Sequence, residues 1–82
     1  PSFAVEILSP GSIKHDTITK RAIYEKNSVR EYWIVDPEAR SIAQFVLRKK
    51  HYVVTELFEN DTIRSAVLSG FEARVGALLG LK

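Results

Sequence analysis

The stretch FAVEILSPGS, residues 3–12, carries a single carboxylate, Glu6, within an apolar run that ends at turn residues. A short apolar run of this kind is typical of a β-strand, which we predict over residues 3–8. Side chains alternate between the two faces of a strand, so Glu6 shares a face with Ala4 and Leu8. A buried carboxylate is costly unless it is paired or binds a metal. Three interpretations follow for Glu6: its face lies at the edge of the sheet, it pairs with Lys20 or Arg21, or it is a metal ligand.

The rest of the chain predicts two helices and several further strands. Asp16 is the expected N-cap of a helix over residues 17–26, and EYWIV, residues 31–35, is an expected buried strand. The remaining predicted segments are a turn at 36–40, hairpin strands at 41–48 and 52–58, a turn at 59–62, a strand at 63–67 and a helix at 73–79. A strand, a helix and a strand in this order predict a parallel crossover, and the hairpins add antiparallel strands. The fold class is α/β: a mixed β-sheet with one crossover helix, then a β-hairpin and a short C-terminal helix.

Composition places the chain among ordinary globular proteins. It has 82 residues, 45% hydrophobic and 27% charged, which predicts one domain over residues 1–82. There is no cysteine, which excludes disulfides and thiolate metal sites. No signal peptide and no apolar run of about 18 residues is visible, so we expect no membrane segment and a cytoplasmic location. The net charge of +2 supports a nucleic-acid partner only weakly.

Three side chains of the predicted helix share one face. Asp16, Lys20 and Tyr24 stand four residues apart. If this face lies over the first strand, an ammonium and a phenol converge on Glu6. A lysine beside a phosphate can stabilise developing negative charge. The alternative is an exposed ion pair between Asp16 and Lys20, which contributes about 0.3–0.5 kcal/mol.

Other polar residues carry weaker signals. Asp36 precedes a proline, which favours a turn over a metal ligand. His15 and His51 lack metal-site spacing, and we expect both to face solvent. RKKH, residues 48–51, is either a phosphate contact or a solvated hairpin turn. Three aromatic residues are expected in the core or an interface, and not as base-stacking platforms: Tyr32, Trp33 and Phe45.

Three segments in succession carry a family resemblance: FAVEILSPGS (3–12), DTITKRAIY (16–24) and VREYWIVDPEARSI (29–42). This pattern resembles the Uma2 family, a large set of bacterial proteins of largely uncharacterised function. That family is similar in fold to the PD-(D/E)XK restriction-type nucleases. The resemblance extends through the closing segment, residues 52–79. It implies a partial restriction-endonuclease-like core, and a metal-dependent endonuclease that hydrolyses DNA phosphodiesters.

The resemblance also implies roles for individual residues. Glu6 occupies the acidic position that is expected to bind a divalent metal, Mg²⁺, through oxygen. The superfamily often has a lysine two residues later, where this chain has Leu8. Lys20 matches members whose lysine comes from the next helix, so Glu6 and Lys20 form the expected catalytic pair. Tyr24 matches the helix tyrosine of the family, and Ser2 stands where the family usually has Asp.

The family's upstream helix and strands have no counterpart here, so we expect the chain to be the C-terminal part of such a domain. An exposed sheet edge would then favour pairing with a second copy. The expected partners are DNA and a homo-oligomer. The alternative functions are a non-catalytic, self-associating remnant and a small β-rich interaction domain. The nuclease hypothesis places the charged atoms of Glu6 and Lys20 within about 4–6 Å of each other, whereas an interaction domain without nuclease ancestry places them on different surfaces.

Overall fold

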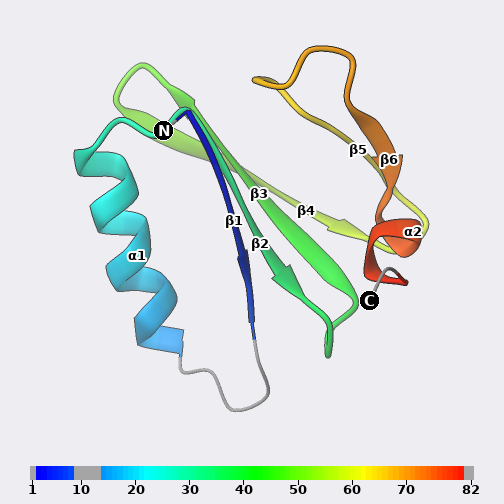
Figure 1. The fold of residues 1–82 in the computed structure, drawn as a ribbon. Helices are drawn as coiled ribbons and strands as arrows, with labels where there is room; N and C mark the ends of the chain where they lie inside the picture. Colours follow the sequence, from blue (N-terminus) through cyan, green and yellow to red (C-terminus); the bar gives the residue numbers. More distant parts are fainter. Residues whose placement is uncertain (1, 9–13, 81–82) are drawn as a thin grey trace.

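The computed structural model describes residues 2–8 and 14–80, which form six strands and two helices, with five of the strands between the helices (Figure 1). Their bounds are β1 (Phe3–Ile7), α1 (Lys14–Lys26), β2 (Glu31–Asp36), β3 (Ser41–Arg48), β4 (His51–Phe58), β5 (Thr62–Arg64), β6 (Glu72–Arg74) and α2 (Val75–Leu79). Within the described residues, neither helix is long and apolar enough to cross a lipid bilayer.

The main sheet contains four strands in the order β1-β2-β3-β4. β1 and β2 are parallel and pair Glu6 with Ile34, whereas β2, β3 and β4 pair antiparallel. The predicted mixed sheet with one crossover helix is therefore confirmed. α1 lies on one side of this sheet, and the small β5–β6 sheet with α2 lies on the other (Figure 1).

An aromatic cluster fills the side of the sheet that faces α1. Tyr32 is fully buried, and its ring stacks on Phe45 with centroids 4.3 Å apart. Tyr52 meets the same ring edge-on, and its hydroxyl donates a hydrogen bond of 2.7 Å to the carbonyl of Val29. Tyr24 of α1 packs against Tyr32 with centroids 4.7 Å apart. This cluster fixes α1 to the sheet, because Tyr24 joins helix and strand.

A second cluster fills the opposite side of the sheet. Trp33, the neighbour of Tyr32 in β2, packs there with Ile42, Ile63 and Val75. Burying an aliphatic side chain of this size contributes about 1.5–3 kcal/mol. Since Ile63 and Val75 come from β5 and α2, this cluster attaches the C-terminal part of the chain to the sheet. The period-two alternation of EYWIV thus supplies one aromatic residue to each cluster.

The structure corrects several predicted boundaries. α1 begins at Lys14, so Asp16 lies inside the helix and is not its N-cap, and His15 is helical. His51 belongs to β4 and not to the turn. The predicted strand at 63–67 is shorter and forms a separate sheet with β6, whose residues Ala73 and Arg74 were expected to be helical. From the sequence we predict a loop over residues 9–15, of which residues 9–13 lie outside the described part of the chain.

Candidate functional site

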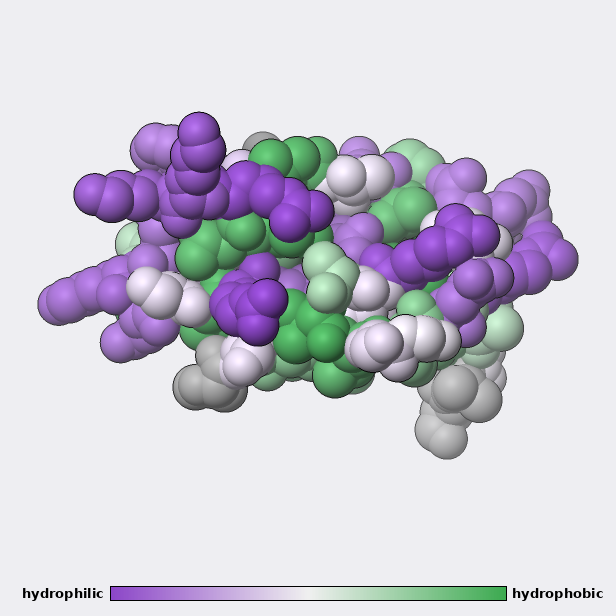
Figure 2. Space-filling model, turned by 90° about the horizontal axis from the view of Figure 1, so that it is seen from above, coloured by the Kyte–Doolittle hydropathy of each residue, from purple (hydrophilic) through white to green (hydrophobic). Residues whose placement is uncertain are grey.

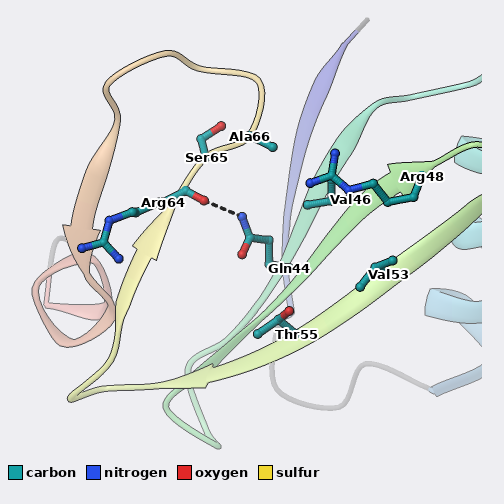
Figure 3. Close-up of a pocket in the computed structure, with 8 residues that line it drawn as sticks. All are labelled: Gln44, Val46, Arg48, Val53, Thr55, Arg64, Ser65 and Ala66. Atoms are coloured by element: carbon teal, nitrogen blue, oxygen red, sulfur yellow. Dashed lines mark hydrogen bonds between the residues drawn. The ribbon is translucent and has the colours of Figure 1, made fainter.

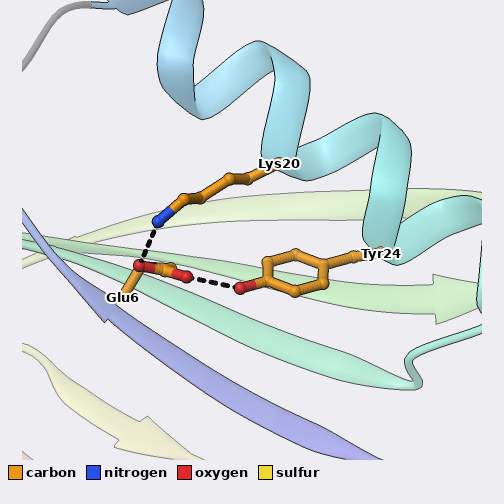
Figure 4. Close-up of polar contacts among 3 residues, drawn as sticks. All are labelled: Glu6, Lys20 and Tyr24. Atoms are coloured by element: carbon orange, nitrogen blue, oxygen red, sulfur yellow. Dashed lines mark hydrogen bonds and ion pairs between the residues drawn. The ribbon is translucent and has the colours of Figure 1, made fainter.

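Glu6 projects from β1 toward α1, and two side chains of the helix meet its carboxylate (Figure 4). The Nζ atom of Lys20 lies 2.9 Å from Oε2, and the hydroxyl of Tyr24 donates to Oε1 at 2.5 Å. Lys20 and Tyr24 are one helical turn apart, so both reach the same strand residue. The predicted proximity of Glu6 and Lys20 is confirmed. The side chain of Asp16 lies outside the described part of α1.

The contacts at Glu6 determine its charge. The hydrogen bond from Tyr24 and then that from Lys20 hold the pKa of Glu6 below 4.5, although burial acts in the opposite direction. Burial and the bond to Glu6 raise the pKa of Tyr24 to about 12. At neutral pH the trio is therefore a carboxylate held by an ammonium and a neutral phenol. The side chains of Lys20 and Glu6 are 45% and 28% exposed, so a solvent-borne ligand can reach them.

The described residues do not complete a metal site. A carboxylate oxygen is the donor type that Mg²⁺ prefers, and Glu6 provides one such group. However, the side chains that the structure describes, in residues 2–8 and 19–80, contain no cluster of three or more histidine or acidic groups that could hold a metal ion. Asp36 instead accepts a hydrogen bond of 3.1 Å from the backbone N–H of Ala39, which confirms the turn interpretation. A metal at Glu6 therefore requires ligands from elsewhere.

Glu31 is a buried carboxylate that the sequence analysis did not single out. It is fully buried at the start of β2 and accepts five hydrogen bonds of 2.7–3.0 Å. The donors are Trp33 Nε1, Gln44 Nε2, Ser65 Oγ and the backbone N–H groups of Ala66 and Val67. Burial raises the pKa of Glu31, but these hydrogen bonds outweigh it and hold the pKa below 4.5. Glu31 thus fastens the loop after β5 to the main sheet.

One signal in the sequence could have identified Glu31. Period-two alternation along EYWIV places it on the same face as Trp33, where an apolar side chain would be expected. A carboxylate on that face must find several donors, since a buried charge is stable only when it is hydrogen-bonded. Glu31 lies on the opposite side of the sheet from Glu6, so its role is structural support and not direct participation in the Glu6 site.

The sequence of this chain is similar to a known protein family. The model of the Uma2 family, described as "Putative restriction endonuclease", matches residues 1–76. The chain belongs to the Uma2 family. No curated protein matches it.

A solved structure supports the fold of this Uma2 chain. A "putative nuclease belonging to DUF820" from Anabaena variabilis ATCC 29413 superposes with a TM-score of 0.79 at 15% sequence identity. The match covers 96% of this chain and 44% of that one. The fold is therefore nuclease-like, and the Uma2 chain spans less than half the length of that neighbour.

A groove of about 370 Å³ lies on the face of the Uma2 sheet opposite Glu6 (Figure 3). Its lining comes from β3, β4 and the start of the loop after β5, and comprises Gln44, Val46, Arg48, Val53, Thr55, Arg64, Ser65 and Ala66. Gln44 spans its inner end by donating to Glu31 Oε2 at 2.8 Å and to the carbonyl of Arg64 at 2.7 Å. The groove is thus bordered by the loop that Glu31 holds in place.

Proposed function

We propose that this chain is a nuclease-like domain that takes part in the hydrolysis of DNA phosphodiesters in the cytoplasm, with Glu6 and Lys20 as its catalytic pair. One observation carries the proposal: α1 places the ammonium of Lys20 2.9 Å from the Glu6 carboxylate at a solvent-accessible position of a nuclease-like fold. Membership of the Uma2 family, described as "Putative restriction endonuclease", supports the same reaction class.

Each side chain of the trio has a distinct proposed role. Lys20 carries the positive charge that can stabilise negative charge on a phosphate oxygen in the transition state. Glu6 supplies an ionised carboxylate at the same point. Tyr24 is a positioning residue, because its hydroxyl holds Oε1 and orients the carboxylate.

The proposal includes a requirement for Mg²⁺. Glu6 is one oxygen donor, and the additional carboxylates would come from a second chain, from a longer form of the domain, or from Asp16, whose side chain lies outside the described part of α1. The superposed neighbour is more than twice as long as the aligned segment, so its fold has room for such residues. Activity is accordingly expected to depend on what completes the site.

A plasmid-nicking assay with Mg²⁺ or Mn²⁺ tests the proposal. We expect Glu6→Gln and Lys20→Ala to abolish nicking, whereas Glu72→Gln, which removes an acid from an exposed ion pair with Arg64, leaves nicking unchanged. A parallel NMR titration should shift the resonances of Glu6 and Lys20 at millimolar metal. Unmoved resonances, together with nicking that survives Glu6→Gln, would overturn the nuclease assignment.

A second candidate function is a non-catalytic, self-associating domain. Within the described sheet β1 is an edge strand, and its apolar residues Val5 and Ile7 are 46% and 68% exposed. An open, apolar edge strand is a template for pairing with another chain. If this function holds, sedimentation should show a dimer that Val5→Lys dissociates and that Ile23→Lys, a change at an exposed apolar residue of α1, leaves intact. A monomer at all concentrations would eliminate it.

A further inference from the structure

Positive charge is concentrated at one end of the main sheet. The turn between β3 and β4 presents Arg48, Lys49 and Lys50 in succession, and all three are exposed. Arg30 joins them, because its carbonyl accepts a hydrogen bond of 2.8 Å from the N–H of Leu47. We call Arg30, Arg48, Lys49 and Lys50 the cationic end.

The opposite end of the same strands is acidic. β3 and β4 pair Arg48 with His51 at the cationic end and Ser41 with Phe58 at the other, about 23 Å away at 3.3 Å per residue. Four acidic residues and two arginines flank that far end and together carry −2: Asp36, Glu38, Glu59, Asp61, Arg40 and Arg74. The cationic end carries four positive charges, whereas the whole chain has a net charge of only +2, so all other residues together carry −2. The molecule is therefore electrically polarised along its strands.

The cations of this end are available for an external anion. Within the described residues, the ion pairs join Lys20 to Glu6, Arg40 to Glu59 and Arg64 to Glu72, and none involves the cationic end. The negative charge of Glu25 in α1 acts on Tyr52, which lies beside the cationic end. Glu25 therefore offsets at most one of the four positive charges. Four exposed cations against one acid leave a local excess of about three charges.

The shape of the surface suits an extended anion. Arg48 belongs to the cationic end and also lines the groove on the β3–β4 face (Figure 3). Figure 2, seen from above relative to Figure 1, shows hydrophilic side chains projecting at both ends of the molecule, on the side of α1 and on the side of β5 and β6, with hydrophobic groups between them. The four cations come from the β3–β4 turn, from the end of β3 and from the residue before β2, so they are spread over neighbouring segments.

We infer that the cationic end binds the phosphodiester backbone of DNA. This inference rests on the proposed function, for which it identifies a surface, separate from the Glu6 site, that anchors the DNA backbone. Phosphate contacts by flexible lysines and arginines supply sequence-independent affinity through the release of counterions. The spread of four cations over a turn and an adjacent loop matches a linear array of phosphates better than it matches a single small anion.

Fluorescence anisotropy of a labelled DNA duplex, without metal and across NaCl concentrations, tests the inference on the full 82-residue chain. The test variant is Lys49→Asn with Lys50→Gln, since asparagine tolerates the positive φ of 58° at position 49. The matched control is Arg40→Asn with Arg74→Gln at the acidic end, where Arg40 has a similar φ of 52°. Both variants remove two positive charges.

We expect the slope of log affinity against log salt to fall by about 1.8 in the test variant, and affinity at 0.1 M salt to fall at least about tenfold, because each lost phosphate contact contributes a slope of about 0.9. The control should retain the slope. Equal losses of affinity and slope in both variants would show that DNA binding depends only on the net charge of the protein, and would overturn the inference. So would binding to phosphatidylserine vesicles without binding to DNA.

The same variants separate this inference from the proposed function. Glu6→Gln should bind DNA as tightly as the wild type, since Glu6 lies on the other side of the sheet from the groove. Salt-dependent binding at the cationic end without any nicking would leave the surface intact and reject the catalytic pair. Nicking that is unchanged by Lys49→Asn with Lys50→Gln would leave the catalytic pair intact and reject the cationic end as the DNA-binding surface.

Discussion

Replacement of Glu31 by glutamine tests the buried network most directly. Oε1 of Glu31 accepts three hydrogen bonds from the loop after β5, and Oε2 accepts two, from Trp33 and Gln44. A glutamine amide keeps the shape but replaces one accepting oxygen by a donor. The least costly orientation places its NH₂ group at the Oε2 position. There the indole N–H of Trp33, which can only donate, loses its acceptor.

The expected cost follows from the number of donors that are left unpaired. A buried donor without an acceptor costs about 1–3 kcal/mol, and the lost bonds are to a charged group. Gln44 can rotate its amide to face the new NH₂ group, but this removes its bond to the carbonyl of Arg64. The unpaired indole donor therefore costs about 1–3 kcal/mol, whereas the carbonyl of Arg64, whose bond to Gln44 is exposed, can bind water instead. A chain of this size has a total stability of roughly 4–12 kcal/mol, so the loss is large.

Urea unfolding followed by fluorescence provides the measurement, because Trp33 is the sole tryptophan and donates directly to Glu31. The control is Glu72→Gln, whose exposed ion pair contributes at most about 1 kcal/mol. A free energy of unfolding for Glu31→Gln within about 0.5 kcal/mol of the wild type would refute the account of the network, since even one unpaired donor exceeds that value.

Three further predictions concern charge and close packing. The pKa of Glu6 is lowered in the folded state, so ionised Glu6 stabilises the folded protein above pH 4.5, and this stabilisation is lost as the pH falls through the folded pKa. Glu6→Gln should therefore flatten this part of a plot of the free energy of unfolding against pH. Burial and the bond to Glu6 raise the pKa of Tyr24 to about 12, and burial raises the pKa values of the other two tyrosines, so absorbance at 295 nm should show less phenolate at pH 10 in the folded than in the unfolded protein. Equal phenolate absorbance of the folded and unfolded protein at pH 10 contradicts the structure. Gly76→Ala should lower the free energy of unfolding by about 1–3 kcal/mol, because the added Cβ would lie 2.9 Å from the carbonyl oxygen of Glu59. Gly80→Ala, with its nearest contact at 3.5 Å, is the matched control, and equal effects in urea unfolding would contradict this explanation.

The sequence predicts the elements that local patterns determine. The parallel pairing of β1 with β2 and the proximity of Glu6 to Lys20 follow from a strand, a helix and a strand in succession, because the helix must return over the sheet. The start of α1 was misplaced at Asp16. A capping side chain contributes about 1 kcal/mol, and each additional helical residue adds a backbone hydrogen bond that competes with this preference.

Long-range pairings account for the features that the sequence did not predict. Glu31 receives four of its five donors from Gln44 and from residues 65–67, and nothing near Glu31 in the sequence identifies these four. β6 is a strand of three residues that exists through pairing with β5, whereas its sequence EAR resembles the start of the following helix. Tertiary contacts thus override local propensity at both positions.

β2 separates two hydrophobic clusters, with Tyr32 in one and Trp33 in the other. Tyr32 and Trp33 are adjacent in one strand and cannot move independently, so a movement of the strand that disrupts one cluster also displaces the aromatic residue of the other. The two sides of the molecule should therefore melt as one cooperative unit, and tyrosine and tryptophan signals should report the same midpoint. In a small protein this arrangement couples two small hydrophobic clusters through one interior strand, so that both unfold over the same barrier.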